Sequence, residues 1–250
     1  MASFKNAEQS HEHSLEFLNL LYAHDSFLDS LQVVADMGCG QGLDVEWWAT
    51  LETREDPPEP RNYTVYAVDK DLRQLEPSIA ELPNVFPIDS DYSRICIPRK
   101  ADMIWAHDSF QFSLEPMNTL KAWNDMLNVN GMLAITLPQP VYMHNNRLES
   151  HGYNHQYFNY NILNLIYMLG VNGFDCRDAY FYRTYNEQWL YAAVYKAQDA
   201  MDPATTSWYD LADKNLINDS MKNSLNTNGH VKLDDLIVCW LDKNLYKVKD

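Results

Sequence analysis

The amino-acid sequence predicts an α/β fold built on a doubly wound, seven-stranded, mostly parallel sheet whose last two strands form an antiparallel hairpin. Three observations predict it. Short apolar runs alternate with stretches of helical spacing, which is the order that gives a parallel sheet with crossover helices. Gly38, Gly40 and Gly42, three of the eight glycines in the chain, separate the first strand-like run from the next helix. Two late runs, Phe174 to Tyr182 and Trp189 to Tyr195, stand close enough in sequence to pair.

The first elements surround the glycine cluster. Helical spacing predicts a helix from Ser14 to Leu28, and the apolar run from Gln32 to Asp36 predicts a buried strand. A helix should follow the glycines, because Leu43, Trp47 and Leu51 stand one turn apart on a shared face.

That helix cannot continue through the segment from Glu52 to Arg61, because three prolines there remove backbone donors and clash with the preceding turn. An exposed loop is predicted instead. The later elements keep the alternation of strand and helix. We expect strands at Thr64 to Val68, Val85 to Ile88, Ala101 to Ala106 and Met132 to Thr136, and helices at Leu72 to Ala80, around Leu120, Trp123 and Leu127, and at Asn161 to Leu169.

The chain has 250 residues, of which 46% are hydrophobic, and this is enough for one large α/β domain. We expect an N-terminal helical cap over residues 1–30, the main domain over 31–198, and a helical extension over 199–250 that packs on it. Helical spacing in the extension is carried by Leu233, Leu236, Ile237, Trp240 and Leu241.

The composition of the chain indicates in which cell compartment the protein works and which classes of partner are disfavoured. No stretch approaches the roughly 18 uncharged apolar residues of a membrane span, and no apolar signal core is present near residue 1. The four cysteines lie far apart without a C-x-x-C pair, so neither a disulfide framework nor a zinc cluster is predicted. We therefore expect a cytoplasmic protein without a membrane partner. The net charge of -16 disfavours nucleic-acid binding, which relies on Lys and Arg against phosphates.

The glycine cluster is the strongest functional signal. Glycine permits a tight turn and lets main-chain N–H groups approach a ligand at the start of a helix. A purely structural turn is the alternative, but the position directly after a strand favours a binding loop. The stretch from Val33 to Gly42 resembles the first motif of class I S-adenosylmethionine-dependent methyltransferases, written D-x-G-x-G-x-G. Its fixed positions fall on Asp36, Gly38, Gly40 and Gly42.

That resemblance implies a Rossmann-like methyltransferase fold and S-adenosylmethionine as the cofactor, with Cys39 inside the binding loop. The next apolar strand, Val65 to Asp69, ends in an acid, and a carboxylate there can accept both ribose hydroxyls of an adenosine. Asp69 is therefore the expected ribose-binding residue, with Lys70 beside it. An ordinary aspartate that closes a strand is the alternative.

The third cofactor segment is Asn84 to Tyr92, which is similar to the family segment whose acid contacts the adenine amino group. Asp91 falls at that position, with Tyr92 beside it, and Asp89 is the fallback. A carboxylate suits an exocyclic amine because it only accepts hydrogen bonds. Either aspartate could equally be an N-cap or turn residue.

The fourth segment, Ala101 to Phe110, looks like the family's fourth strand and the loop beyond it, which borders cofactor and substrate. His107 is the candidate general base in this loop, because a histidine titrates near neutral pH and can take a proton from an acceptor. A histidine that only lines the cofactor pocket is the alternative.

Candidate acceptor-binding residues follow the fifth strand, where a segment can cover the ligand crevice of this fold. They are Tyr142, His144, His151 and His155. A core or lid role is the alternative for each of them. His151 and His155 stand four apart, but no third ligand joins them at a recognised spacing, so no metal site is predicted.

The resemblance implies methyl transfer by in-line displacement to a small-molecule acceptor whose identity the sequence leaves open. A catalytically silent cofactor-binding module in an assembly, and a protein or nucleic-acid methyltransferase, are the alternatives. A nicotinamide dehydrogenase is disfavoured by the glycine spacing. The runs His11 to Leu15 and Glu46 to Thr50 also look like methyltransferase-like proteins of marine bacteriophages, which would place the protein in a bacterial host cytoplasm.

Overall fold

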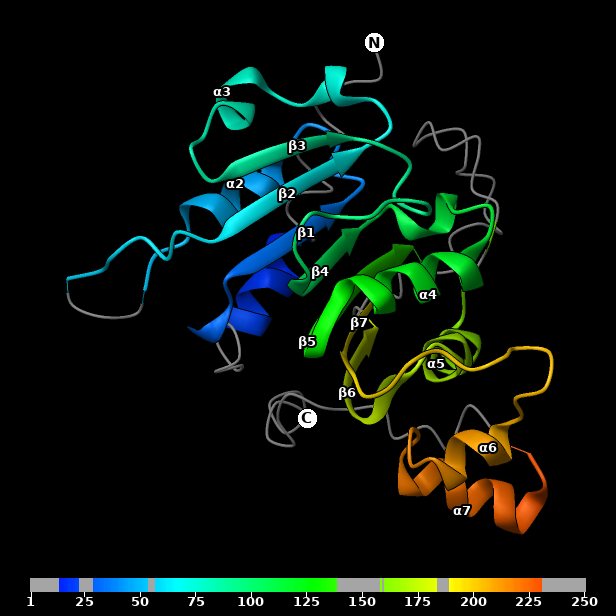
Figure 1. The fold of residues 1–250 in the computed structure, drawn as a ribbon. Coiled ribbons are helices and arrows are strands. Elements are labelled where there is room, and N and C mark those ends of the chain that lie inside the picture. Colours follow the sequence, from blue (N-terminus) through cyan, green and yellow to red (C-terminus); the bar gives the residue numbers. More distant parts are fainter. Residues whose placement is uncertain are drawn as a thin grey trace.

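A computed structural model describes residues 14–22, 29–53, 57–138, 158, 160–183 and 189–230 of the chain. Its centre is a seven-stranded sheet with the order β3-β2-β1-β4-β5-β7-β6 (Figure 1). The strands are β1 (Val33–Met37), β2 (Thr64–Asp69), β3 (Val85–Asp89), β4 (Ala101–His107), β5 (Leu127–Pro138), β6 (Phe174–Arg183) and β7 (Trp189–Lys196). The pairs among β1 to β5 are parallel, and β7 pairs antiparallel with both β5 and β6. The predicted fold class is confirmed.

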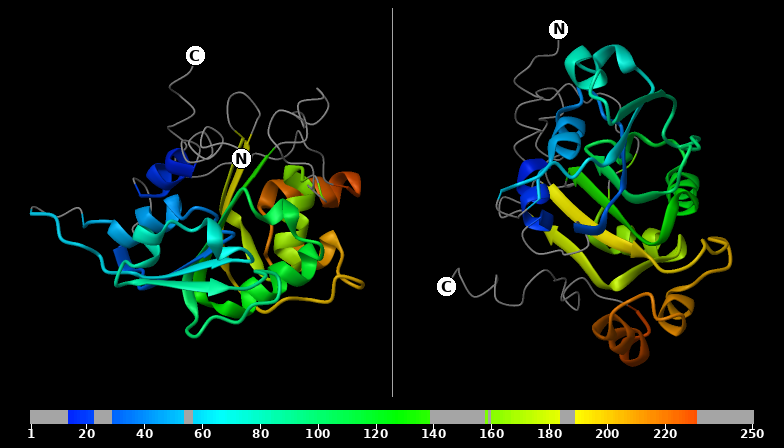
Figure 2. Two further views of the ribbon diagram at one scale, coloured as in Figure 1. Left: turned by 90° about the horizontal axis from the view of Figure 1, so that it is seen from above. Right: turned by 60° about the vertical axis from the view of Figure 1, so that its left-hand side comes forward.

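Helices cover both faces of this sheet (Figure 2, left). One face carries a helix over residues 14–22, α2 (Leu43–Thr50) and α3 (Pro77–Ala80), and the other carries α4 (Pro116–Met126) and α5 (Ile162–Val171). Each face has its own apolar core, because side chains alternate across a strand. Only part of the expected helix from Ser14 to Leu28 can be compared, since residues 23–28 lie outside the described ranges.

Asp102 in β4 links the amino ends of β1, β4 and β5 by hydrogen bonds. Its Oδ2 accepts hydrogen bonds from the backbone N–H groups of Gln32 and Val33, each at 3.0 Å, and its Oδ1 accepts one from Nδ2 of Asn128 at 2.8 Å. Because β1 to β5 are parallel, their carboxyl ends lie together at the opposite edge of the sheet.

The helix expected from Leu72 to Ala80 is wrong as a single element. The structure has a short 3-10 helix, η2 (Leu72–Gln74), and then α3, with Leu75 and Glu76 extended between them. Pro77 is the reason, because proline disfavours helical backbone at the residue before it and suits the first position of a new helix.

The expected boundary between the next helix and β5 is also wrong. Leu127 ends α4 as its C-cap and is already the first residue of β5, where it pairs with Ala101. The strand then runs through Asn130, at φ 62°, and Gly131 instead of starting after them. Asparagine tolerates the left-handed region, so this turn signal lies inside an irregular part of the strand.

The buried face of α2 differs from the expected one. The sequence placed Leu43, Trp47 and Leu51 on it, but the helix buries Asp44, Val45, Trp48 and Ala49 against the sheet. Trp47 and Leu51 pack at the margin of this core. The shift in phase brings an acidic side chain, Asp44, to the sheet.

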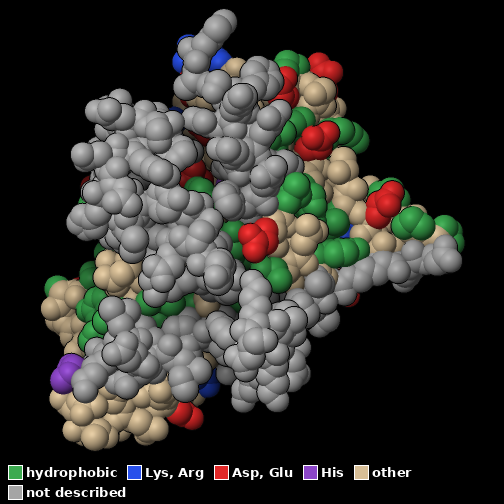
Figure 3. Space-filling view, turned by 180° about the vertical axis from the view of Figure 1, so that it is seen from behind, with side chains coloured by type: hydrophobic (Ala, Val, Ile, Leu, Met, Phe, Trp, Pro, Cys, Tyr) green, Lys and Arg blue, Asp and Glu red, His purple; other side chains and the backbone are tan. Residues whose placement is uncertain are grey.

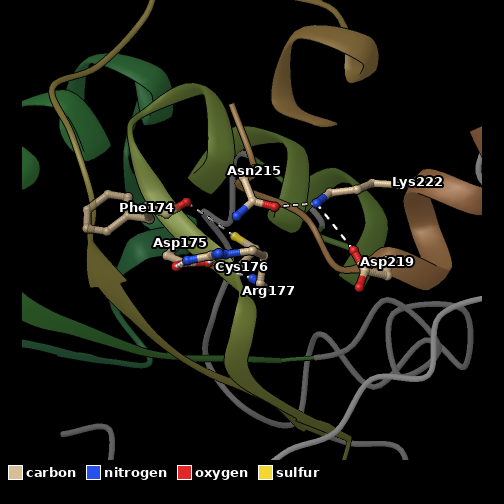
Figure 4. Close-up of polar contacts among 7 residues, drawn as sticks. All are labelled: Phe174, Asp175, Cys176, Arg177, Asn215, Asp219 and Lys222. Atoms are coloured by element: carbon tan, nitrogen blue, oxygen red, sulfur yellow. Dashed lines mark hydrogen bonds and ion pairs between the residues drawn. The ribbon is translucent and has the colours of Figure 1, made fainter. Parts of the chain in front are cut away.

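Two short helices follow the sheet, α6 (Trp208–Asp213) and α7 (Asp219–Asn228), and they lie beside α5 at the β6 end of the molecule (Figure 1). The N–H of Cys176 in β6 donates to the carbonyl of Leu216 at 2.9 Å. Lys222 donates to Asn215 and pairs with Asp219 at 3.3 Å, which ties α7 to the preceding loop (Figure 4). The helix expected around residues 233–241 lies outside the described residues.

The apolar side chains of this segment complete the core of the α5 face. They are Leu211, Leu216, Ile217, Met221 and Leu225. At Gly170 of α5, an added Cβ would stand 3.0 Å from Cδ1 of Leu211, so α6 lies close to the backbone of α5. The small glycine makes this close packing possible.

In the described part of the chain, no helix is long and apolar enough to cross a membrane. On the face opposite to that of Figure 1, the described Asp and Glu side chains stand apart from one another among hydrophobic and other side chains (Figure 3).

Candidate functional site

The glycine loop leaves the carboxyl end of β1 and leads into α2. It is held against β2, because the N–H groups of Gly38 and Cys39 both donate to the carbonyl of Val68, at 2.8 and 3.1 Å. All three glycines have positive φ angles: 88° at Gly38, 51° at Gly40 and 88° at Gly42. Residues with a side chain adopt this region only at a cost in free energy, so the loop conformation requires glycine.

Each glycine also meets a different environment. A Cβ added at Gly38 would stand 2.5 Å from Cβ of Ser109, and one at Gly42 would stand 2.4 Å from Cδ1 of Leu75. At Gly40, no atom of the described residues lies within 4 Å of the added atom. Gly38 and Gly42 therefore allow close packing inside the protein, whereas Gly40 borders open space.

Asp69, at the carboxyl end of β2, faces this open part of the loop. Its Oδ2 accepts a hydrogen bond from the N–H of Gly40 at 3.0 Å, and its Oδ1 accepts one from the N–H of Asp71 at 2.9 Å. A carboxylate has about four acceptor sites, so both oxygens can accept further hydrogen bonds from a ligand. The two backbone donors fix the orientation of the carboxylate.

Asp36 is the most buried acid of the loop, at 3% exposure. Within the described residues, its Oδ2 is buried and has no hydrogen-bond partner. Burial raises the pKa of Asp36 well above its usual value, and the nearby charges of Asp44 and Asp69 raise it further.

Replacing Asp36 with asparagine is expected to stabilise the protein at alkaline pH. The folded state holds a proton on Asp36 that the unfolded chain releases at lower pH, so wild-type stability falls as pH rises from the unfolded pKa toward the folded one. An amide avoids this loss. Thermal unfolding should show the D36N midpoint above the wild type by roughly 2 °C or more at pH 8, with a smaller difference at pH 4. A variant less stable than wild type at both pH values would contradict the interpretation.

His107 ends β4 beside the loop, with a side chain that is only 8% exposed. Its ring stacks near Trp105, with centroids 6.3 Å apart and planes at 16°, and near Trp189, at 6.0 Å and 26°. Nδ1 lies 3.6 Å from Oδ2 of Asp44. In the described part of the chain, two aromatic side chains and one carboxylate therefore lie next to this imidazole.

Asp44 belongs to the same site, although it is not among the residues predicted from the sequence. Its Oδ1 accepts a hydrogen bond from Oγ of Ser14 at 2.5 Å, and its Oδ2 accepts one from Nε1 of Trp105 at 2.8 Å. An acid in the first turn of a helix is usually explained by the helix dipole. A helical face set by Val45 and Trp48 would have shown that Asp44 is buried.

Tyr92 and Ser109 close the loop on the other face of the sheet. Oγ of Ser109 donates to the carbonyl of Met37 at 2.5 Å, and the hydroxyl of Tyr92 donates to the carbonyl of Ser109 at 2.8 Å. Burial raises the pKa of Tyr92, and the charges of Asp91 and Asp69 add to this effect. Tyr92 is thus a neutral donor that joins the end of β3 to the loop after β4.

The two adenine candidates lie at the end of β3, and both are exposed. Oδ1 of Asp91 accepts hydrogen bonds from the backbone N–H of Ser93 at 2.9 Å and from its hydroxyl at 2.6 Å. This is the turn geometry that the sequence leaves open as the alternative to adenine binding. Asp89 is the last residue of β3 and pairs in register with Asp69.

Two other candidates contribute differently. The side chain of Cys39 is buried in the core of the α2 face, where burial raises the pKa of its thiol, and Asp36 and Asp69 raise it further. Its backbone N–H, not its thiol, takes part in the loop. Lys70 is exposed at the edge of the sheet beside Asp69.

Four candidates lie outside the described residues: Tyr142, His144, His151 and His155. In the part of the chain that is described, no cluster of three or more His, Cys, Asp or Glu side chains is arranged to hold a metal ion. The structure therefore brings together the residues at the ends of β1, β2 and β4, with Tyr92 reaching them from β3.

No protein-family model and no curated protein matches the chain in sequence. Solved structures do match it. A protein assigned as an S-adenosylmethionine-dependent methyltransferase of Listeria monocytogenes has a TM-score of 0.55 and 16% identity over 73% of this chain and 98% of that one. The N-methyltransferase NodS of Bradyrhizobium japonicum WM9, with S-adenosyl-L-homocysteine bound, has a TM-score of 0.53 and 10% identity over 75% and 87%.

A third match is phosphoethanolamine N-methyltransferase 2 of Haemonchus contortus in complex with S-adenosyl-L-methionine. It has a TM-score of 0.51 and 13% identity, and the match covers 67% of this chain and 49% of that one. At such identities the likeness concerns the fold. The chain has the Rossmann-like fold of the class I methyltransferases, as its first motif predicts.

Proposed function

We propose that the protein binds S-adenosylmethionine and transfers its methyl group to a small-molecule acceptor. One observation carries the proposal. The glycine loop leaves open space at Gly40, next to a carboxylate that backbone donors hold in place at the end of the neighbouring strand. In open α/β sheets, ligands bind outside the carboxyl ends of the strands.

The described residues fit this cofactor. Asp69 has acceptor capacity left for the two ribose hydroxyls, and Gly40 leaves room for a ligand beside it. Asp91, or Asp89 as the fallback, would accept from the adenine amino group, with Tyr92 next to the base. The buried, unpartnered Oδ2 of Asp36 is a polar atom that a ligand at the loop would satisfy. Three matching folds belong to methyltransferases, and two of those structures hold the cofactor or its product.

The cofactor supplies a methyl group that a sulfonium already activates, so the protein has to align the acceptor and exclude water. His107 is our proposed general base for the proton that an amine or hydroxyl acceptor loses, and its position at the end of β4, beside the glycine loop, supports this role. We keep Tyr142, His144, His151 and His155 as proposed acceptor residues. A nucleic-acid acceptor stays disfavoured by the net charge of -16.

Replacing Asp69 with asparagine is expected to weaken binding of S-adenosylhomocysteine by about tenfold to a hundredfold, because a charged acceptor of hydrogen bonds is lost. Isothermal titration calorimetry on the full chain measures this. Arg73→Ala is the matched control, since its side chain in η2 is 90% exposed, and it should bind like wild type. Tight binding of a nicotinamide dinucleotide by the wild type, without binding of S-adenosylhomocysteine, would overturn the proposal.

A further inference from the structure

Asp44 is a buried carboxylate, 8% exposed, in the first turn of α2. Burying a charged group costs free energy unless hydrogen bonds compensate. Ser14 and Trp105 supply two such bonds, from the helix over residues 14–22 and from β4. Asp44 therefore joins three elements at one point on the α2 face of the sheet.

His107 lies against this point because of strand geometry. Trp105 and His107 are two residues apart in β4, so their side chains leave the sheet on the same face. The near-parallel rings of Trp105 and Trp189 restrict the plane of the imidazole. Asp44 then meets the edge of the ring that carries Nδ1, at 3.6 Å. Catalytic hydrogen bonds are often this long without a ligand and shorten when one binds.

Two buried acids, Asp36 and Asp44, lie on the same face of the sheet as His107, and their surroundings differ. Asp36 stands on the same face in β1, in register with Trp105. Burial raises the pKa of Asp36 well above its usual value, and the nearby charges of Asp44 and Asp69 raise it further. The two hydrogen-bond donors of Asp44 favour its ionised form.

Among the described residues, two further side chains on this face are uncharged. Thr136 of β5 pairs in register with His107, and Tyr191 of β7 pairs with Thr136. Glu16, on the helix over residues 14–22, lies 3.4 Å from the hydroxyl of Tyr191. Glu16 is exposed, so water screens its charge more than that of Asp44.

We infer that Asp44 is a positioning residue for His107: its carboxylate accepts from Nδ1–H and leaves the lone pair on Nε2 as the basic atom. The inference rests on the proposed function for its catalytic meaning. The hydrogen-bond partners of the two ring nitrogens determine which of them carries the proton in a neutral histidine. An ionised carboxylate can only accept a hydrogen bond, so the ring nitrogen that faces it carries the proton.

The test is the protonation of His107 in the ¹⁵N-labelled full chain, followed by long-range ¹H–¹⁵N NMR over a pH titration. In the wild type, we expect the Nδ1–H tautomer above the pKa of His107. In Asp44→Asn, the amide can present an N–H to the ring, so the proton should move toward Nε2. The loss of a neighbouring negative charge should also lower the pKa of His107 by roughly one unit.

Glu16→Gln is the matched control, because it removes one negative charge on the same face without touching the ring edge, and both properties of His107 should stay as in the wild type. An Nε2–H tautomer in the wild type overturns the inference, even if the Asp44 variant does not fold. An unchanged tautomer and pKa in Asp44→Asn overturns it as well. The measurement needs neither cofactor nor acceptor, so a failure to bind S-adenosylhomocysteine would refute the proposed function separately.

Discussion

Replacing Gly38 with alanine is expected to lower the free energy of unfolding by about 2–5 kcal/mol, from overpacking and from the cost of a positive φ. The added Cβ would stand 2.5 Å from Cβ of Ser109, closer than such atoms can approach. Ser109 cannot retreat easily, because its hydroxyl donates to Met37 and its carbonyl accepts from Tyr92. Urea unfolding followed by circular dichroism measures the loss.

Alanine variants at Gly40 and Gly229 distinguish an effect on stability from an effect on cofactor binding. Both have positive φ, 51° and 74°, and in the described part of the chain no atom lies within 4 Å of a Cβ added at either. Alanine at either position should cost only the backbone strain, roughly 1–2 kcal/mol. Gly229 caps the end of α7, whereas Gly40 borders the proposed cofactor site.

Only Gly40→Ala should then weaken binding of S-adenosylhomocysteine, because its methyl group enters the open space beside Asp69. We expect a loss of at least about tenfold, equal to 1.4 kcal/mol, against an unchanged affinity for Gly229→Ala. Equal affinity in both variants would show that the ligand does not approach Gly40. Wild-type stability in Gly38→Ala would show that Ser109 is not packed as described.

The sequence was sufficient for the sheet because buried strands and crossover helices leave separate patterns. Apolar runs marked each strand, and the glycines marked the turn after β1. The predicted boundaries were wrong where one residue belongs to two elements or where a turn signal lies inside a strand. Leu127 has the spacing of a helix and the pairing of a strand, and Asn130 gives a turn signal within β5. In both cases the pairing of β5 with β4 determines the boundary, and a local sequence pattern does not reveal which strands pair.

The candidate site was predictable to the extent that its parts follow strand ends. Asp69 and His107 are predicted as site residues because each closes an apolar run. Asp44 was missed because an acid at a helix start has a local explanation, and its burial depends on which face of α2 meets the sheet. Asp91 shows the reverse, since its turn with Ser93 is local chemistry that a family position alone does not reveal.

The second large effect is expected at His107. Replacing it with asparagine should lower the rate of methyl transfer by about a hundredfold or more, because a general base is lost. Binding of S-adenosylhomocysteine should stay within about threefold of wild type, since the loss concerns the reaction and not the cofactor. The assay measures S-adenosylhomocysteine formed with a panel of small amines and hydroxyl compounds, and Glu16→Gln serves as the control on the same face.

The pH dependence gives a second readout with a fixed sign. A protonated imidazole cannot accept a proton, so the wild-type rate should fall as pH drops below the pKa of His107, and the asparagine variant should lack this limb. A variant that keeps the wild-type rate would reduce His107 to a residue that lines the site. A wild type that binds S-adenosylhomocysteine but turns over none of the acceptors would favour a cofactor-binding module without catalysis, because the loop and Asp69 serve binding alone in that case.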